Sequence, residues 1–145
     1  MKYFLLSAVL SIIDLVSKKS VKGKITLGKK KKIKGKLYLW HIKNKGMAYN
    51  KFEDSPKKVM MISSAVSAFI ACYLAHLVKS GAGLAEKIGV SMVLGGGLGN
   101  LIDRIQHKEV TDFIYVDIKK APIFNLADIF ALAGGIITVI GSYFK

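Results

Sequence analysis

Cysteine, proline and acidic residues are scarce in this chain of 145 residues. Its single cysteine, Cys72, excludes an intramolecular disulfide framework and a zinc site built on several cysteines. Its two prolines and a mean hydropathy of +0.38 argue against a disordered chain. The length fits one domain and not comfortably two, so we expect residues 1–145 to form a single domain.

The nine acidic residues stand against 23 Lys and Arg, which gives a formal net charge of +14. The surplus is local, because residues 18–58 contain 15 of the basic residues and only two of the acids. The remainder, with 8 basic and 7 acidic residues, carries a charge of only +1. A basic surplus is typical of nucleic-acid-binding proteins, but a nearly neutral, apolar body is a poor partner for duplex DNA. We therefore expect no nucleic-acid partner.

Four long apolar segments dominate the chain, at residues 3–21, 59–78, 84–103 and 123–144. A membrane-spanning helix needs about 20 mostly apolar residues. The second and fourth segments supply them outright, and the first and third do so with their flanks. A soluble four-helix bundle would need a polar face on each helix, yet residues 59–78 offer only serines, Cys72 and His76. The predicted fold class is therefore a mainly α membrane protein with four transmembrane helices.

The basic segment at residues 22–58 is expected to be a loop that contains a small β-sheet. Its apolar and polar residues alternate with a period of two, and Gly28 and Gly35 break the alternation. Tyr38 and Trp40 are placed to lie at the level of the lipid headgroups.

Polar residues gather at one end of the predicted bundle. If four spans run up and down, the end of the first, the start of the second, the end of the third and the start of the fourth lie on the same side. That side then holds Asp14, Asn44, Gly46, Asn100, Asp103, Arg104, Asp112, Asn125 and Asp128. An acid inside a membrane span costs about 2.5–3.5 kcal/mol on insertion scales and marks a functional site.

A purely structural role is a serious alternative for two of these acids. Asp14 and Asp103 lie near predicted helix ends, where a cap or an ion pair with Arg104 would explain them. Asp128 is harder to explain in this way, because it lies within an apolar run between Ala127 and Ile129.

Two carboxyl groups that meet at a membrane boundary favour aspartic-protease chemistry. If they lie within a few ångströms of each other, they share one proton, so that one acts as a general base on water while the other polarises a carbonyl. A proton or cation pathway would use the same residues, so spacing alone leaves both open. His41, His76 and His107 are not at metal-ligand spacing, and we expect neither a metal nor a cofactor.

Five motifs in the same order resemble those of the lipoprotein signal peptidase (signal peptidase II) family. Asp14 and Lys18 match D-x-x-x-K, and Asn44, Gly46 and Ala48 match N-x-G-x-A-F. GGGLGNLIDR (95–104) matches the glycine-rich G-N-x-x-D-R, VTDF (110–113) matches V-x-D-F, and FNLAD (124–128) matches F-N-x-A-D. The chain departs from the family pattern at Tyr49 and Asn50, in the lysine run at 29–32 and in a short loop between the third and fourth spans.

The resemblance implies an intramembrane aspartyl endopeptidase that removes the signal peptide from prolipoproteins, cleaving before a cysteine that carries a diacylglyceryl group. It implies that the catalytic pair is Asp112 and Asp128, with Asp103 as the rival of Asp112. Around the pair it places Asp14, Lys18, Asn44, Gly46, Asn100, Asp103, Arg104 and Asn125. By the same resemblance, Asn100 and Asn125 are suited to hydrogen-bond the carboxylates, and Arg104 is suited to hold a substrate carbonyl.

The resemblance also implies a multi-pass bacterial cell membrane protein with an extracytoplasmic active face and sheet. We expect a monomer, although the sequence itself does not determine the oligomeric state. The positive-inside rule would instead place the basic loop in the cytoplasm. We side with the motifs and expect a diacylglyceryl prolipoprotein and membrane lipids as partners. The basic face either binds anionic headgroups or is solvated charge without a specific partner. The alternatives are a transporter or proton-conducting protein, for which the acids are too clustered, and an inactive scaffold, which the presence of both aspartates argues against.

Overall fold

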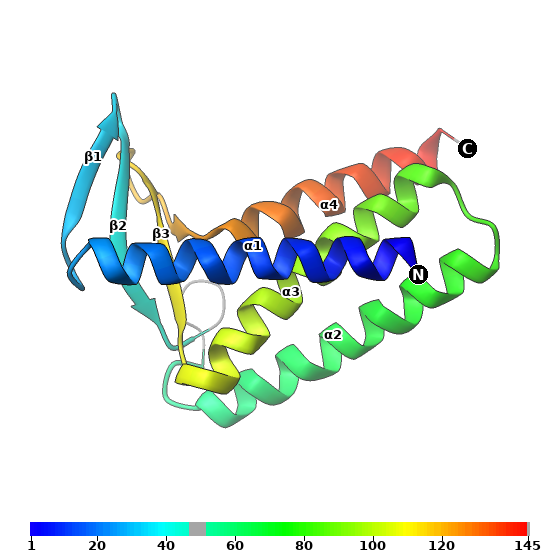
Figure 1. The fold of residues 1–145 in the computed structure, drawn as a ribbon, viewed down its shortest axis with the longest axis horizontal. Coiled ribbons are helices and arrows are strands. Elements are labelled where there is room, and N and C mark those ends of the chain that lie inside the picture. The colour runs from blue at the N-terminus through cyan, green and yellow to red at the C-terminus, as the bar shows by residue number, and fades with distance from the viewer. Residues whose placement is uncertain (47–51, 145) are drawn as a thin grey trace.

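A computed structural model describes residues 1–46 and 52–144 (Figure 1). The matched Ala48 and the departures at Tyr49 and Asn50 lie outside the described residues. The described residues form the helices α1 (Lys2–Lys24), α2 (Pro56–Lys79), α3 (Leu84–His107) and α4 (Leu126–Tyr143). They also form the strands β1 (Lys30–Lys34), β2 (Leu37–Asn44), β3 (Val110–Val116) and β4 (Ile123–Phe124).

Helix α3 is the centre of the bundle and packs against the other three helices. Its glycines allow this close approach, because a Cβ on Gly96 would collide with the carbonyl oxygen of Ala127 on α4. On α1, Ser7 Oγ donates a hydrogen bond to the Ser91 carbonyl (2.8 Å) and Ser11 Oγ to the Gly95 carbonyl (2.7 Å). The glycine-rich segment is therefore a helix-packing surface.

The outward faces of the helices are apolar, with Phe69 on α2 and Leu132 and Val139 on α4 among the most exposed side chains. Within the described part of the chain, α2 and α4 are long and apolar enough to cross a membrane. Helices α1 and α3 occupy the other two predicted spans but do not reach that criterion. Charged residues near the ends of both, together with the glycines of α3, lower their hydropathy.

The strands form one antiparallel sheet in the order β1-β2-β3-β4. The predicted hairpin is present, with Gly35 (φ +54°) in the turn between β1 and β2. The prediction that the sheet is confined to the loop between the first two helices is wrong, because β3 and β4 come from the segment between α3 and α4. Residues 110–113 are buried and rich in β-branched and aromatic side chains, which favours a central strand over a loop.

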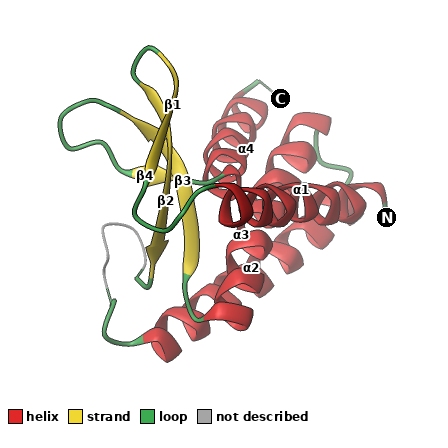
Figure 2. Cartoon of the chain, turned by 60° about the vertical axis from the view of Figure 1, so that its left-hand side comes forward, coloured by secondary structure: helices red, strands yellow, loops and turns green. Residues whose placement is uncertain are grey.

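The sheet lies across one end of the bundle (Figures 1 and 2). Phe113 of β3 packs on Val21 and Ile25 at the end of α1, in a cluster that also includes Leu39 and Ile114. The ends of α1 and α3 and the starts of α2 and α4 lie at this end, whereas both chain termini lie at the other (Figure 1). The predicted convergence of these four helix ends is thus confirmed.

Candidate functional site

A cavity of about 600 Å³ opens between the sheet and the starts and ends of the helices. Its walls come from β2, α3, β3, the segment before α4 and the first turn of α4. The lining residues are Ile42, Lys43, Asn44, Asn100, Arg104, Val110, Asp112, Lys120, Ala121, Pro122, Ile123, Phe124 and Asp128. Two carboxyl groups, those of Asp112 and Asp128, therefore face one cavity whose other walls are partly apolar and partly basic.

A capping box at the start of α4 fixes Asp128. The side chain of Asn125, the N-cap residue, accepts a hydrogen bond from the Asp128 backbone N–H (3.0 Å). In return, Asp128 Oδ2 accepts one from the Asn125 backbone N–H (3.0 Å). The apolar segment predicted from residue 123 begins with the two residues of β4, Ile123 and Phe124, and the helix itself begins at Leu126.

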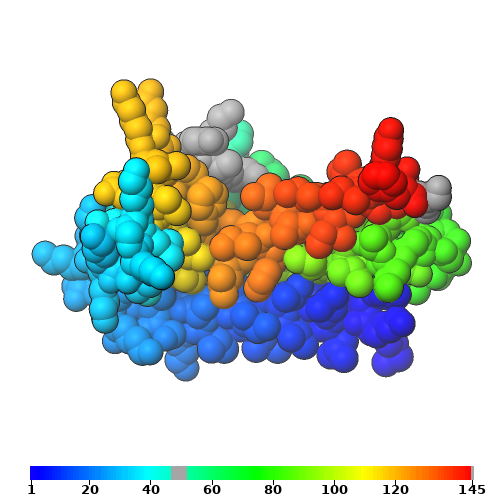
Figure 3. Space-filling model, turned by 90° about the horizontal axis from the view of Figure 1, so that it is seen from above, coloured from blue at the N-terminus to red at the C-terminus, as the bar shows by residue number. Residues whose placement is uncertain are grey.

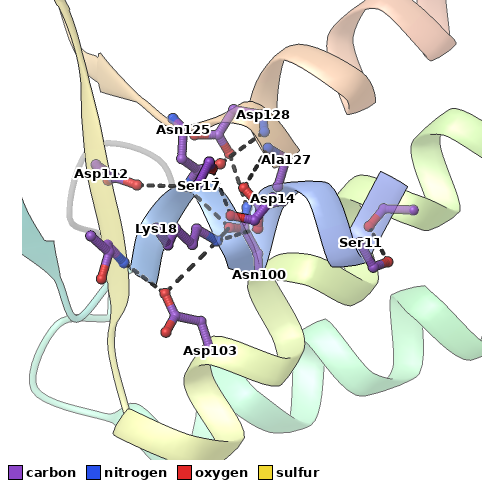
Figure 4. A network of polar contacts seen from close by, with 12 residues as sticks. Ser11, Asp14, Ser17, Lys18, Asn100, Asp103, Asp112, Asn125, Ala127 and Asp128 are labelled. Carbon is purple, nitrogen blue, oxygen red and sulfur yellow. Dashed lines mark hydrogen bonds and ion pairs between the residues drawn. The ribbon is translucent and has the colours of Figure 1, made fainter. Parts of the chain in front are cut away.

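Two asparagine amides, of buried Asn125 and half-buried Asn100, connect the two carboxyl groups (Figure 4). Asn125 Nδ2 donates to Asp112 Oδ1 (2.7 Å) and to Asn100 Oδ1 (3.1 Å). Asn100 Nδ2 then donates to Asp128 Oδ1 (3.0 Å). The bridge places Asp112 of a strand and Asp128 of a helix in one hydrogen-bond network.

The orientation of the Asn100 amide follows from Lys18. The Lys18 ammonium lies 2.8 Å from Asn100 Oδ1, and an ammonium can only donate hydrogen bonds. The amide oxygen must therefore face Lys18, and the NH₂ group must face Asp128. A buried cation thus determines which end of the amide reaches the carboxylate.

Asp112 lies on β3, opposite Ile42 of β2, and its side chain is only 5% exposed. Burial raises the pKa of its carboxyl to about 6, and the negative charge of Asp128 also raises it. Hydrogen bonds from Asn44 Nδ2 (3.0 Å) and Asn125 Nδ2 oppose this rise. Such a carboxyl changes its protonation state close to neutral pH, as a group that exchanges protons with a substrate must.

A second polar cluster lies behind the asparagine bridge and includes Asp14, Lys18, Lys22, Asp103 and His107. Lys18, which is 1% exposed, lies 2.6 Å from Asp14 Oδ2 and 3.8 Å from Asp103 Oδ2. Asp103 also contacts Lys22 (3.2 Å) and His107 (2.9 Å) and accepts a hydrogen bond from the Thr111 N–H (2.9 Å).

These contacts hold the Asp103 side chain outside the cavity, so Asp103 is not one of the residues that line it. They also contradict an ion pair between Asp103 and Arg104, because the ion pairs of Asp103 in the described structure are with Lys18, Lys22 and His107. Asp14 is tied to the start of α4, since its Oδ1 accepts a hydrogen bond from the Ala127 N–H (2.9 Å).

Arg104 and Gly46 meet at the edge of the cavity. Arg104 Nη2 donates to the Gly46 carbonyl (3.1 Å), and the Gly46 N–H donates to Asn44 Oδ1 (3.0 Å). An arginine that binds one backbone carbonyl here has further N–H groups for another. The buried Nε of Arg104 has no hydrogen-bond partner among the described residues.

The structure brings every predicted site residue to this end of the molecule. Sequence reasoning missed Lys22 and His107 of the buried cluster and the segment at residues 120–124, which forms one wall of the cavity. His107 follows Asp103 by four residues in a helix, a spacing that could have identified it. Lys22 follows Lys18 by four residues, as Lys18 follows Asp14, and this repeated spacing could have identified Lys22 in the same way. Nothing in the sequence distinguishes the wall segment.

A metal centre has no ligand set in the described part of the chain, where no group of three or more His, Cys, Asp and Glu side chains could hold a metal ion. The carboxyl groups at the cavity are instead bound by amide N–H groups, which leaves them free for proton transfer.

The family profile and the known proteins that are similar to this chain agree with one another. A family profile described as "Signal peptidase (SPase) II" matches residues 6–144. The chain is 33% identical over 147 residues to a lipoprotein signal peptidase of Geobacillus kaustophilus, covering 99% of this chain and 94% of that protein. It is 36% identical over 127 residues to a lipoprotein signal peptidase of Enterococcus faecalis, covering 87% and 78%.

Two solved structures of bacterial membrane enzymes, both obtained by the in meso method, are also similar. The one at 2.3 Å resolution has a TM-score of 0.84 and 26% identity, over 98% of this chain and 87% of that one. The one at 1.9 Å resolution has a TM-score of 0.81 and 28% identity, over 96% and 90%.

Proposed function

The chain belongs to the signal peptidase II family, and on that basis we propose that Asp112 and Asp128 are its catalytic pair. The family consists of aspartic peptidases, and the chain accordingly removes the signal peptide from prolipoproteins. The single observation that supports the choice of residues is the asparagine bridge, which joins these two carboxyl groups at one cavity.

In the proposed mechanism, the pair holds one proton between the two carboxyl groups. Burial favours Asp112 as the protonated member, since its side chain is 5% exposed and that of Asp128 is half-buried. Ionised Asp128 takes a proton from water, whose oxygen attacks the scissile carbonyl carbon. Asp112 gives its proton to the carbonyl oxygen. The tetrahedral intermediate then collapses as Asp128 gives the proton it took from water to the leaving nitrogen, and Asp112 takes back a proton from a hydroxyl of the intermediate as the new carboxyl group forms.

The amides define where the shared proton lies. Each carboxyl group already accepts two N–H bonds, from Asn44 and Asn125 on Asp112 and from the Asn100 side chain and Asn125 backbone on Asp128. These donors cannot accept a proton, so it must lie on the oxygen lone pairs that face the cavity or the partner carboxyl. The proton is then directed toward the substrate.

The other site residues hold this arrangement or bind substrate. Lys18 orients Asn100, while Asp14 and Asp103 neutralise Lys18. Arg104 and the Gly46 backbone are proposed to bind the substrate backbone, because their N–H and C=O groups meet beside the cavity.

We also propose how the protein lies in the membrane and which substrate it cleaves. All four helices cross a bacterial cell membrane, the chain is a single-domain monomer, and the sheet and cavity face the extracytoplasmic side. The substrate is a diacylglyceryl-modified prolipoprotein that is cut before the lipidated cysteine. Its acyl chains would remain in lipid beside the exposed apolar helix faces while the peptide enters the cavity.

The test is cleavage of a lipidated prolipoprotein by purified protein, followed as a gel shift, with the unlipidated form run in parallel. Asp112→Asn and Asp128→Asn should each abolish cleavage, because either change removes a proton donor and acceptor from the pair. Asp117→Asn is the matched control, since Asp117 is exposed at the end of β3 and should retain full activity. Substantial turnover by either of the first two variants, when both fold and insert, would refute the pair.

A further inference from the structure

The face of the sheet that holds Asp112 continues beyond the cavity. Side chains alternate between the two faces of a strand, and residues paired across neighbouring strands share a face. On β3, Ile114 and Val116 therefore lie on the face of Asp112. Their partners on β2, Leu39 and Leu37, lie on it too, and Leu37 and Val116 are each 39% exposed. An apolar surface thus leads from the cavity along this face, which we call the cavity face.

The opposite face of the sheet is the one that meets α1. Phe113 belongs to it and packs on the end of that helix. Tyr115, two residues further along β3, lies on the same face, and the Lys30 ammonium is 5.7 Å from the centre of its ring. Asp117, directly after β3, accepts a hydrogen bond from the Tyr115 hydroxyl. Lys30 and, by alternation, Lys32 of β1 therefore belong to the α1 side of the sheet.

Two other lysines of β1 lie on the cavity face. Lys31 pairs with Leu39. Lys34, beyond a bulge in β1, pairs with Leu37. Every residue of β1 is exposed, and in the described structure neither lysine forms a salt bridge. Within the four described strands, Asp112 is the one acidic residue. The positive charge of these two lysines is therefore available to a carboxylate from outside the chain.

The order of the strands places these lysines at the outer edge of the sheet. The strands run across the helix axes at one end of the bundle, and β1 is the outermost (Figure 1). In space-filling view, β1 and β2 lie at the end of the molecule opposite the C-terminus (Figure 3). Neighbouring strands are about 4.8 Å apart, so β1 lies about 10 Å beyond β3, a distance that about three residues of extended chain span. A peptide that is cut at Asp112 and continues outward therefore crosses the cavity face of β2 and reaches the lysines of β1.

We propose that Lys31 and Lys34 select prolipoproteins that carry an acidic side chain shortly after the cut bond. This rests on the proposed function, in which Asp112 is one of the catalytic pair. The signal peptide then remains in the membrane, and the chain that follows the lipidated cysteine leaves across the cavity face of the sheet. Leu37 and Val116 contact this chain, and the two lysines bind a carboxylate about three residues past the cut.

The experiment compares lipidated substrates that differ at the third residue after the cut bond, which is Glu, Gln or Lys. Cleavage is measured in a neutral detergent without added lipid, at substrate concentrations that define kcat and KM. An exposed ion pair contributes about two- to fivefold to binding, so kcat/KM should be severalfold higher for the Glu substrate than for the Gln substrate and lowest for Lys. The difference should lie in KM, because the ion pair is made in both the bound substrate and the transition state. High salt should reduce it.

The Gln substrate distinguishes this inference from the proposed function. Its cleavage by the parent protein, and the loss of that cleavage in Asp112→Asn, test the catalytic pair without a charge at the third residue. Normal cleavage with equal kcat/KM for Glu and Gln would refute the selection alone. Failure to cleave any of the three substrates would refute the proposed function and, with it, the selection that depends on it.

Two lysine pairs on the same strand provide the matched comparison. Lys31→Gln with Lys34→Gln should bring the ratio of kcat/KM between the Glu and Gln substrates close to one. Lys30→Gln with Lys32→Gln removes the same charge from the α1 side of the sheet and should leave this ratio as it is in the parent. Equal effects of the two pairs on the ratio would overturn the proposal. A preference for Glu that appears only when anionic lipid is added would assign the lysines to lipid headgroups and would overturn it as well.

Discussion

Lys18→Met should separate a structural role of the buried ion cluster from a role in positioning Asn100. Methionine keeps most of the volume of the side chain but removes the ammonium, which lies 2.6 Å from Asp14 and 2.8 Å from Asn100. Removing one partner of a buried ion pair costs about 3–5 kcal/mol, because the remaining charge is left without compensation. We expect a loss of this size in the free energy of unfolding.

Lys22→Met is the control for charge removal in the same cluster. The Lys22 side chain is 29% exposed, and among the described residues its ion pair is with Asp103, at 3.2 Å. A half-exposed pair of this kind contributes about 0–1 kcal/mol, and Asp103 keeps its bond from the Thr111 N–H. Lys22→Met should therefore change both stability and cleavage little.

The double variant Asp14→Asn with Lys18→Met distinguishes the two roles. It no longer leaves Asp14 as an uncompensated charge, so thermal unfolding in detergent should recover part of the lost stability. Cleavage should stay low, because Asn100 still lacks the donor that directs its NH₂ group to Asp128, and kcat should fall more than KM rises. Recovery of full cleavage together with stability would refute the role of Lys18 in orienting Asn100.

Three further predictions follow from particular contacts. Because burial raises the pKa of Asp112 from 3.8 to about 6, the folded state binds this proton more tightly than the unfolded state, and stability is lost as pH rises from about 4 to 6. Asp112→Asn should therefore be more stable than the parent above pH 6, by on the order of 3 kcal/mol, and lack this pH dependence in thermal unfolding; equal slopes would contradict the assignment. Asn44→Ala removes a hydrogen bond that lowers the pKa of Asp112, so the limb of the pH–cleavage profile that reports this group should move to higher pH by about 1 unit, and a move to lower pH would be inconsistent with it. Gly96→Ala places a Cβ against the Ala127 carbonyl and should cost about 1–3 kcal/mol in unfolding measurements, whereas Gly135→Ala, with open space around it, should be neutral or stabilising by up to about 1 kcal/mol; similar values for the two would refute the tight packing of α3 on α4.

The sequence carried strong signals for the helices and weak ones for how the loops combine. Long apolar runs identify the helices because each run is a local property of the chain, and the four helix ends meet as their order predicts. The pairing of β2 with β3 joins residues about 70 positions apart, and the local composition of VTDF, although it favours a strand, does not identify the strand with which it pairs. For the same reason the apolar run at residues 123–144 does not show that its first two residues form a strand, since Ile123 and Phe124 are as apolar as the helix that follows.

For the site, too, the location of the residues could be predicted from the sequence but their contacts could not. The polar residues of the site stand out in an apolar chain, and their presence at one end follows from topology. Their connections do not, because the sequence leaves open whether Asp103 or Asp112 is joined to Asp128. The contacts of Lys18, Lys22 and His107 with Asp103, and of Asn125 with Asp112, depend on side-chain directions that only the packed helices and sheet define.

The pairing of β3 between β2 and β4 has a consequence for the biogenesis of the protein. Asp112 lies on the strand that joins an early part of the chain to a late one, so its position requires residues 37–44 and 123–124 to be in place on both sides. During synthesis from the N-terminus, the capping box that holds Asp128 forms later still, when α4 begins to fold. The two carboxyl groups of the proposed pair therefore come together only after the first turn of α4 has formed.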